Sequence, residues 1–119
     1  MTTKELGDLG EKIAIQFLRE KGLEIVCTNY RFHHNEVDII YKLSDKYVFV
    51  EVKTRQTNEI GPPWKAVTKS KQKQIIKCAH EYLVSHDLEE EAQFDIISIV
   101  HNSYGTNIEH IEDAFYPMR

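Results

Sequence analysis

Two strand-like segments, residues 35–41 and 47–55, constrain the fold of this chain more than any other feature. Both are rich in β-branched and aromatic residues, and the polar segment Leu43–Lys46 separates them, which predicts an antiparallel hairpin. Apolar side chains occupy both faces of these strands, with Phe49 on one face and Val48 on the other. Strands of this kind are usually covered on both sides, so we expect a sheet between helices.

Acidic residues interrupt both predicted strands. Side chains two positions apart share a face about 7 Å apart, so Glu51 lies beside Lys53, and Glu36 beside Asp38. A hairpin register that brings Asp38 near Glu51 is compatible with the sequence, which leaves the register open. These charges also fit a solvated sheet face. Aspartate is depleted in strand interiors, however, and charges among apolar residues need a partner or a metal ion, which favours a functional site.

Length and composition indicate one soluble globular domain that spans residues 1–119. Its N-terminus lacks an apolar signal region, and no stretch approaches the length of a membrane-spanning helix. Cys27 and Cys78 are the only cysteines. We therefore expect free, buried thiols in a cytoplasmic protein without a membrane partner.

Charge is distributed unevenly along the chain, whose net charge is −4. Residues 52–80 have seven basic side chains against one acidic side chain, a net of +6, whereas residues 81–119 have a net of −8. The overall acidity argues mildly against a nucleic-acid partner, but the basic segment predicts one basic face that could contact phosphates. A solvated lysine-rich helix surface is the alternative. The candidate nucleic-acid-binding residues are Arg55, Lys69, Lys71, Lys73 and Lys77.

A first helix is predicted to begin with a capping box at Thr2 and Glu5 and to stop at Gly22. Glu11 falls at the edge of its apolar stripe. Gly7 and Gly10 flank Glu11, and glycines there would let another element approach closely.

The remaining elements predict a three-layer α/β domain. We expect a strand over residues 23–28, a loop over 29–35, and a loop over 56–64 that is long enough to be functional. A second helix capped by Thr68 should run to about Val84. The last predicted elements are a central strand over residues 94–100 and a weaker strand or strap over 108–115.

The acids suggest a chemistry if Glu11, Asp38 and Glu51 converge. Each pair of carboxylates about 5 Å apart repels by roughly 3 kcal/mol at an effective dielectric near 20, and one lysine offsets only part of that. The cluster would need protonation or a divalent cation, and oxygen ligands suit Mg²⁺ or Mn²⁺. A bound metal lowers the pKa of its water, and a lysine such as Lys53 would stabilise a phosphorane-like charge. This set of residues predicts phosphodiester hydrolysis.

Asp38, followed by Glu51-Val52-Lys53, resembles the signature of the PD-(D/E)XK nuclease superfamily, and Glu11 resembles the additional acid of archaeal Holliday junction resolvases. Nearly the whole chain resembles the small, uncharacterised bacterial YraN-like family. The blocks that carry this resemblance are Gly10-Glu11, Asn29-Tyr30-Arg31, residues 36–40, residues 49–55, Ala66-Val67, Lys71, residues 94–97 and Ala114-Phe115.

The resemblance implies a restriction-endonuclease-like αβββαβ core, a mixed sheet flanked by helices, and a role in DNA processing. By position it implies that Glu11, Asp38, Glu51 and the Val52 carbonyl bind the metal, that Lys53 is the catalytic lysine, and that Glu36 supports these residues. Junction resolvases pair two sites, which is compatible with a homodimer. The prediction is thus a Mg²⁺- or Mn²⁺-dependent endonuclease for structured or branched DNA. The alternative is a nucleic-acid-binding module of the same fold with weak or no catalysis, and the choice between DNA and RNA stays open.

Overall fold

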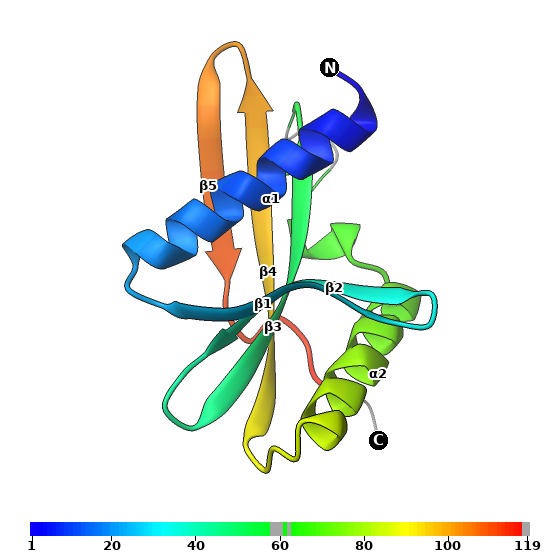
Figure 1. Cartoon of the computed structure of the whole chain (residues 1–119). Helices are drawn as coiled ribbons and strands as arrows, with labels where there is room; N and C mark the ends of the chain where they lie inside the picture. Colours follow the sequence, from blue (N-terminus) through cyan, green and yellow to red (C-terminus); the bar gives the residue numbers. More distant parts are fainter. Residues whose placement is uncertain (58–60, 62, 118–119) are drawn as a thin grey trace.

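The computed structural model describes residues 1–57, 61 and 63–117 of the chain, so part of the predicted loop over 56–64 lies outside the described residues. The helices and strands follow one another in the order of the predicted αβββαβ core, with one further strand at the end (Figure 1). The elements are α1 (Thr3–Glu20), β1 (Glu24–Phe32), β2 (Asn35–Lys42), β3 (Lys46–Arg55), the 3₁₀ turn η1 (Pro63–Ala66), α2 (Lys69–Ser85), β4 (Glu91–Asn102) and β5 (Gly105–Ile111).

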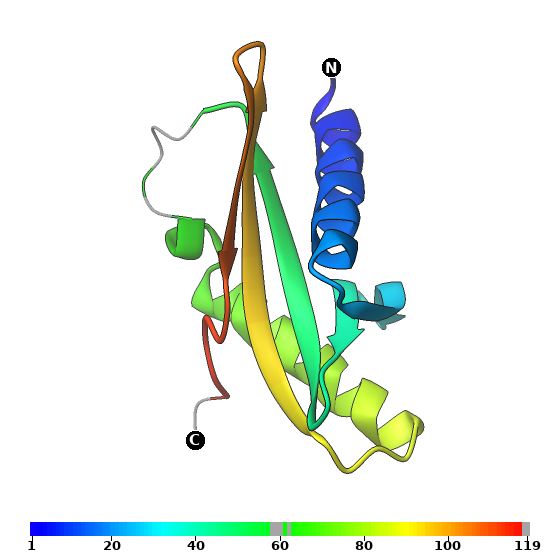
Figure 2. The ribbon, with the colours of Figure 1, turned by 90° about the vertical axis from the view of Figure 1, so that its left-hand side faces the viewer.

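The five strands form one mixed sheet in the order β1-β2-β3-β4-β5. Every neighbouring pair is antiparallel except β3 and β4, which are parallel and are connected through η1 and α2. Helix α1 covers one face of this sheet, and α2 packs on the opposite side (Figure 2). The structure therefore confirms the predicted three layers.

Each face of the sheet has its own apolar core. On the α1 face, Leu18 packs with Val48 and Val50, and on the α2 face Tyr82 packs with Phe49. Alternate residues of β3 thus enter opposite cores, which explains why the strand is apolar on both faces.

Helix α1 begins as predicted. The Thr2 hydroxyl accepts a hydrogen bond from the Glu5 amide at 3.1 Å, and the Glu5 carboxylate accepts one from the Thr2 amide at 2.9 Å. A Cβ atom at Gly10 would lie 1.7 Å from the Thr54 hydroxyl oxygen, so this glycine lets α1 approach β3 closely. Gly7 faces open space, so the same expectation for Gly7 was wrong.

The first strand is longer than the sequence predicted. β1 continues through the expected loop to Phe32, and only His33 and His34 form the turn to β2. Asn29, in the middle of β1, adopts a left-handed conformation with φ 53°, a region that asparagine tolerates better than most residues. At this edge of the sheet the polar side chains of the segment remain in contact with solvent, so their polarity does not end the strand.

A buried polar network joins β2, β4 and β5. The Asp95 carboxylate has no exposed surface and accepts hydrogen bonds from the Tyr41 hydroxyl at 2.6 Å, His110 Nε2 at 2.7 Å, the Gln93 amide at 3.0 Å and the Asp113 backbone amide at 3.0 Å. Burial favours a higher pKa for Asp95, but these donors outweigh it and the pKa is lowered. All four hydrogen-bond donors belong to this chain and already satisfy the Asp95 carboxylate, so we interpret the Asp95 network as structural.

Candidate active site

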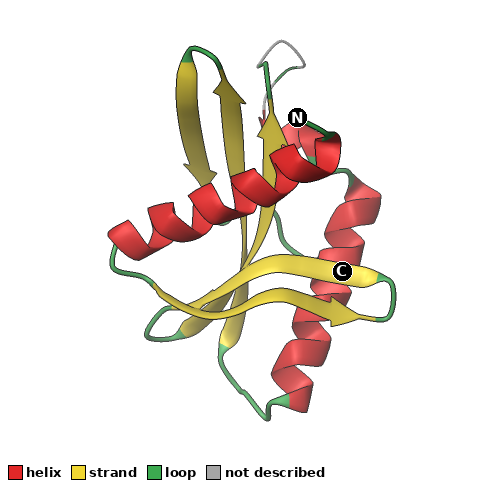
Figure 3. Cartoon of the chain, turned by 45° about the horizontal axis from the view of Figure 1, so that its top comes forward, coloured by secondary structure: helices red, strands yellow, loops and turns green. Residues whose placement is uncertain are grey.

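The candidate site lies where β2 and β3 separate. The two strands pair only from Ile39↔Val50 to Lys42↔Tyr47, although β2 extends to Asn35 and β3 to Arg55. Beyond that pairing the β1–β2 hairpin bends away from the rest of the sheet, across α2 (Figure 3). Asp38 and Glu51 are the first residues past the last pair, so both carboxylates enter the opening between the strands.

Asp38 takes over part of the missing strand pairing. Its Oδ2 accepts a hydrogen bond of 2.8 Å from the Val52 amide, a backbone donor that would otherwise lack a partner in the separated strands. This bond fixes the Asp38 carboxylate beside Glu51, close enough for the charge of Glu51 to raise the pKa of Asp38. The register that the sequence left open thus brings these acids together.

Burial and mutual repulsion control the ionisation of this pair. Burial raises the pKa of Asp38 to about 7, and the charges of Glu51 and Glu36 add to the increase, against the Val52 hydrogen bond. Burial also raises the pKa of Glu51, although Lys71, the Asp38 hydrogen bond and Lys53 each lower it. Near neutral pH the pair therefore relieves its repulsion by holding a proton.

Glu51 has one carboxylate oxygen without a hydrogen-bond donor. The residue is 6% exposed, and its Oε2 is buried and unpartnered within the described part of the chain. Lys71 Nζ lies 3.8 Å from that oxygen, which is an ion-pair distance but too long for a hydrogen bond. A buried anionic oxygen of this kind is a free position for a cation or a water molecule.

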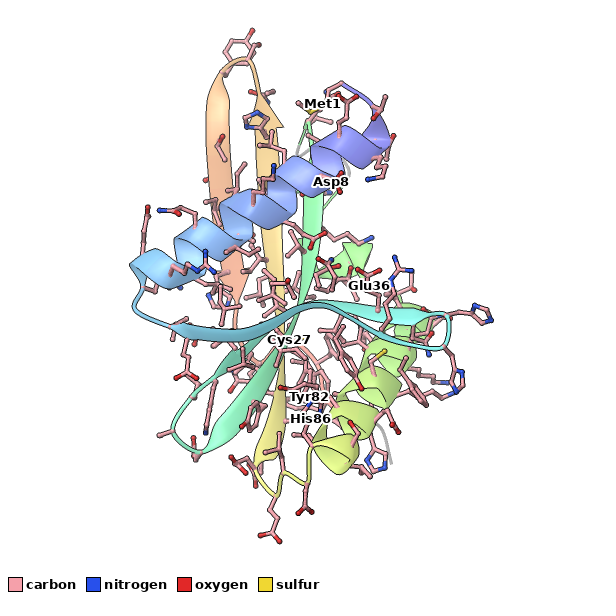
Figure 4. The ribbon with its side chains drawn as sticks, in the orientation of Figure 1. Met1, Asp8, Cys27, Glu36, Tyr82 and His86 are labelled. Carbon is pink, nitrogen blue, oxygen red and sulfur yellow. The ribbon has the colours of Figure 1, made fainter. Side chains whose placement is uncertain are left out.

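Asn29 connects two further acids, which come from different elements. Its amide nitrogen donates to Glu11 Oε1 on α1 at 2.7 Å and to Glu36 Oε1 on β2 at 2.9 Å, and Figure 4 shows Glu36 on the side of β2 toward α1. Burial raises the pKa of Glu11 despite the Asn29 bond, and the charges of Asp38 and Glu36 raise it further. Arg31 also pairs with Glu36, at 3.5 Å.

Asn29 was not predicted from the sequence to be a site residue. The one signal available was its residue type, because asparagine is among the few residues that adopt the left-handed conformation found here.

The basic residues proposed to bind nucleic acid separate into groups. Lys71 lies at the acids, and Arg55 Nη1 approaches the Gly61 carbonyl at 3.5 Å. The other three lysines are exposed and line a hollow on another flank of α2 together with Gln72, Ile76, Tyr116 and Pro117. These three lysines are Lys69, Lys73 and Lys77.

The carboxylates at the site fit a hard cation that is bound by only two side chains and keeps several waters. Within the described residues, no group of three or more His, Cys, Asp and Glu side chains is arranged to hold a metal ion. Mg²⁺, however, usually keeps several waters and is bound by one or two carboxylates together with substrate phosphates. Asp38 and Glu51, with the unpartnered Glu51 oxygen, meet that requirement.

The fold and the candidate site together define the structural class of this protein. The chain is an α/β domain with a mixed five-stranded sheet, consistent with a restriction-endonuclease-like core, in which acids meet at a separation of two strands. Neither of its helices, within the described residues, is both long and apolar enough to cross a membrane. Both cysteines are free; Cys78 is buried and Cys27 partly buried.

Comparisons with known proteins identify the family. The model of the "Uncharacterised protein family UPF0102" matches residues 10–99. The UPF0102 protein of Christiangramia forsetii is 45% identical over 112 residues, which cover 94% of each chain. A UPF0102 protein of Clostridioides difficile is 40% identical over 116 residues, or 97% of this chain and 100% of that one. The chain belongs to the UPF0102 family, which confirms the YraN-like resemblance.

Proposed function

We propose that this chain is a metal-dependent endonuclease of the PD-(D/E)XK superfamily that hydrolyses phosphodiester bonds of structured or branched DNA in the cytoplasm. The observation that carries the proposal is the contact between Asp38 and Glu51, with a buried Glu51 oxygen that has no donor among the described residues. A surface ion pair would not require a partly buried carboxyl group beside a buried one, and perturbed acids of this kind gather at functional sites.

Asp38, Glu51 and the Val52 carbonyl would hold Mg²⁺ or Mn²⁺, with Glu11 as a neighbouring acid. When bound, such an ion polarises a phosphoryl oxygen and lowers the pKa of water. The Val52 amide keeps the Asp38 carboxylate oriented, and Asn29 keeps Glu11 and Glu36 together.

Two lysines would oppose the charge of the phosphodiester. The charges of Lys53 and Lys71 both lower the pKa of Glu51, so both ammonium groups act on the site. Lys53 arrives from β3, two residues after Glu51, and Lys71 arrives from the first turns of α2. Cations placed in this way would stabilise negative charge that develops during hydrolysis.

Cleavage assays test the proposal. Duplex, flap and four-way junction DNAs are incubated with Mg²⁺ or Mn²⁺ and with wild type, Asp38→Asn or Lys53→Ala. Asp45→Asn, in the turn between β2 and β3, and Lys46→Ala, at the first residue of β3, are the matched controls. We expect the two site variants to lose at least about 100-fold in rate while the controls retain activity. Cleavage that persists in both site variants would show a contaminating nuclease and end the proposal. Sedimentation with and without junction DNA tests the expected homodimer.

A second candidate is a nucleic-acid-binding module of the same fold without useful catalysis. It is favoured by the absence, within the described residues, of a ready-made group of three metal-binding side chains. It predicts salt-sensitive DNA binding in EDTA and no turnover with any divalent ion. Calorimetric titration of Mn²⁺ into wild type and Glu51→Gln separates the candidates. If the wild-type protein binds Mn²⁺ and Glu51→Gln does not, the nuclease is supported. If neither protein binds Mn²⁺, the binding module is supported.

A further inference from the structure

A groove runs along the flank of α2 that faces away from the acids. The hollow lined by Lys69, Lys73 and Lys77, with Gln72, Ile76, Tyr116 and Pro117, has a volume of about 290 Å³. A second hollow, of about 540 Å³, shares Ile76, Lys77 and Pro117 with it and continues toward Phe94. We call the two together the α2 groove. The C-terminal segment forms its other wall and lies beside α2 in Figure 2.

One side of the groove has a regular series of positive charges. Lys69, Lys73 and Lys77 are four residues apart, so they follow the helix at a rise of about 6 Å per step. None of the three forms an ion pair within the described residues, and residues 60–80 contain five lysines and no acid. Glu81, at the far end, is the one acid among the described lining residues of the two hollows. A polyanion would match this side of the groove.

The rest of the groove is largely apolar and aromatic, with Gln72 and His80 as further polar lining residues. Tyr116 is 67% exposed, and it lines the first hollow with Pro117 and Ile76. Ala79, Leu83 and Phe94 line the second hollow. Phosphates alone need no such surface, whereas unpaired bases stack on exposed aromatic rings. A duplex keeps its base faces stacked inside, so it would leave Tyr116 unused.

We propose that the α2 groove binds an unpaired strand of nucleic acid, with its phosphates on Lys69, Lys73 and Lys77 and a base against Tyr116. This rests on the proposed function for the class of ligand, and it adds that the substrate has a single-stranded arm. Lys71, which contacts Glu51, lies about 160–200° around the helix from Lys69 and Lys73. The arm is therefore held on one side of α2 while the acids lie on the other.

Binding of a labelled oligothymidylate of about 12 nucleotides, followed by fluorescence anisotropy in EDTA, tests the groove without any cleavage. We expect Tyr116→Ala to weaken binding about 5- to 100-fold through the loss of one base stack, and Tyr116→Trp to restore it. Lys73→Gln should reduce the slope of log K against log salt by about 0.7. Tyr104→Ala, which changes a tyrosine that is 97% exposed on the β4–β5 turn, is the matched control and should have no effect.

The outcomes separate this inference from the nuclease proposal. Binding that is unchanged in Tyr116→Ala, or reduced equally for a duplex of the same length, overturns the single-strand groove. Displacement of the oligonucleotide by polyglutamate with the same dependence on Tyr116 also overturns it, because the groove would then recognise an acidic peptide. Metal-dependent cleavage that survives alongside any of these results leaves the nuclease proposal standing. Tyr116-dependent binding without cleavage supports the groove alone.

Discussion

Asp38→Asn should stabilise the metal-free protein at alkaline pH. Burial and repulsion raise the pKa of Asp38 from 3.8 to about 7 in the folded state, so the folded protein retains a proton that the unfolded chain releases. Stability is then lost as pH rises from about 4 to about 7. At about 1.36 kcal/mol per pH unit, this difference is on the order of 4 kcal/mol above pH 7. An asparagine amide keeps the oxygen that accepts the Val52 hydrogen bond and can donate to Glu51.

Urea unfolding in EDTA, followed by circular dichroism at pH 4 and pH 8, measures this effect. We expect Asp38→Asn to raise the free energy of unfolding by about 2–4 kcal/mol at pH 8 and to change it little at pH 4. The exposed-turn variant Asp45→Asn is the control and should show no such pH dependence. If Asp38→Asn were less stable than wild type at pH 8, or equally shifted at both pH values, Asp38 would not be a partly buried acid held beside a like charge.

Three further predictions concern the site and the packing around it. Mn²⁺ must displace the proton on Asp38, so the affinity of the wild-type protein for Mn²⁺, measured by calorimetry, should rise from pH 6 to pH 8. An affinity that does not change with pH would show that these acids do not bind the ion. Gly10→Ala should lower the free energy of unfolding, measured by thermal unfolding, by about 1–3 kcal/mol because the new Cβ would overlap the Thr54 side chain of β3. Gly7→Ala, on the open side of the same helix, should raise it by about 0.5–1 kcal/mol. Tyr41→Phe removes a donor to the buried Asp95 and should cost about 1.5–3 kcal/mol at neutral pH. The donors that hold the pKa of Asp95 below 3.8 contribute stability that is present above about pH 4 and lost below it, so this variant should unfold at a higher pH during acid titration.

Local sequence patterns predicted the elements of this fold. The capping box at Thr2 and the Thr68 cap, whose hydroxyl accepts from the Lys71 amide at 3.2 Å, occur where the sequence placed them. The hairpin and the central strand predicted over residues 94–100 also follow from hydrophobic periodicity, whereas the parallel pairing of that strand with β3 does not. These features depend on neighbours within a few positions, so the chain alone specifies them.

The meeting of side chains from different elements could not be predicted in this way. The sequence offered Asp38 near Glu51 as one register among several, and it gave no reason for Asn29 to join Glu11 to Glu36. The polarity after residue 28 suggested a loop, but pairing with β2 keeps that segment a strand.

The sequence by itself thus determined the order and type of the helices and strands, though not all of their bounds, that both sheet faces are covered, and that acids interrupt two apolar strands. The tertiary structure alone decided that β2 and β3 separate beyond Ile39 and Val50, and that Lys71 turns toward Glu51 while the other lysines of α2 face the opposite flank. The physical reason is the distance along the chain over which each effect acts. Periodicity and capping depend on residues within one or two turns, whereas the separation of β2 from β3 and the side of α2 that faces the sheet follow from burying two apolar cores at once.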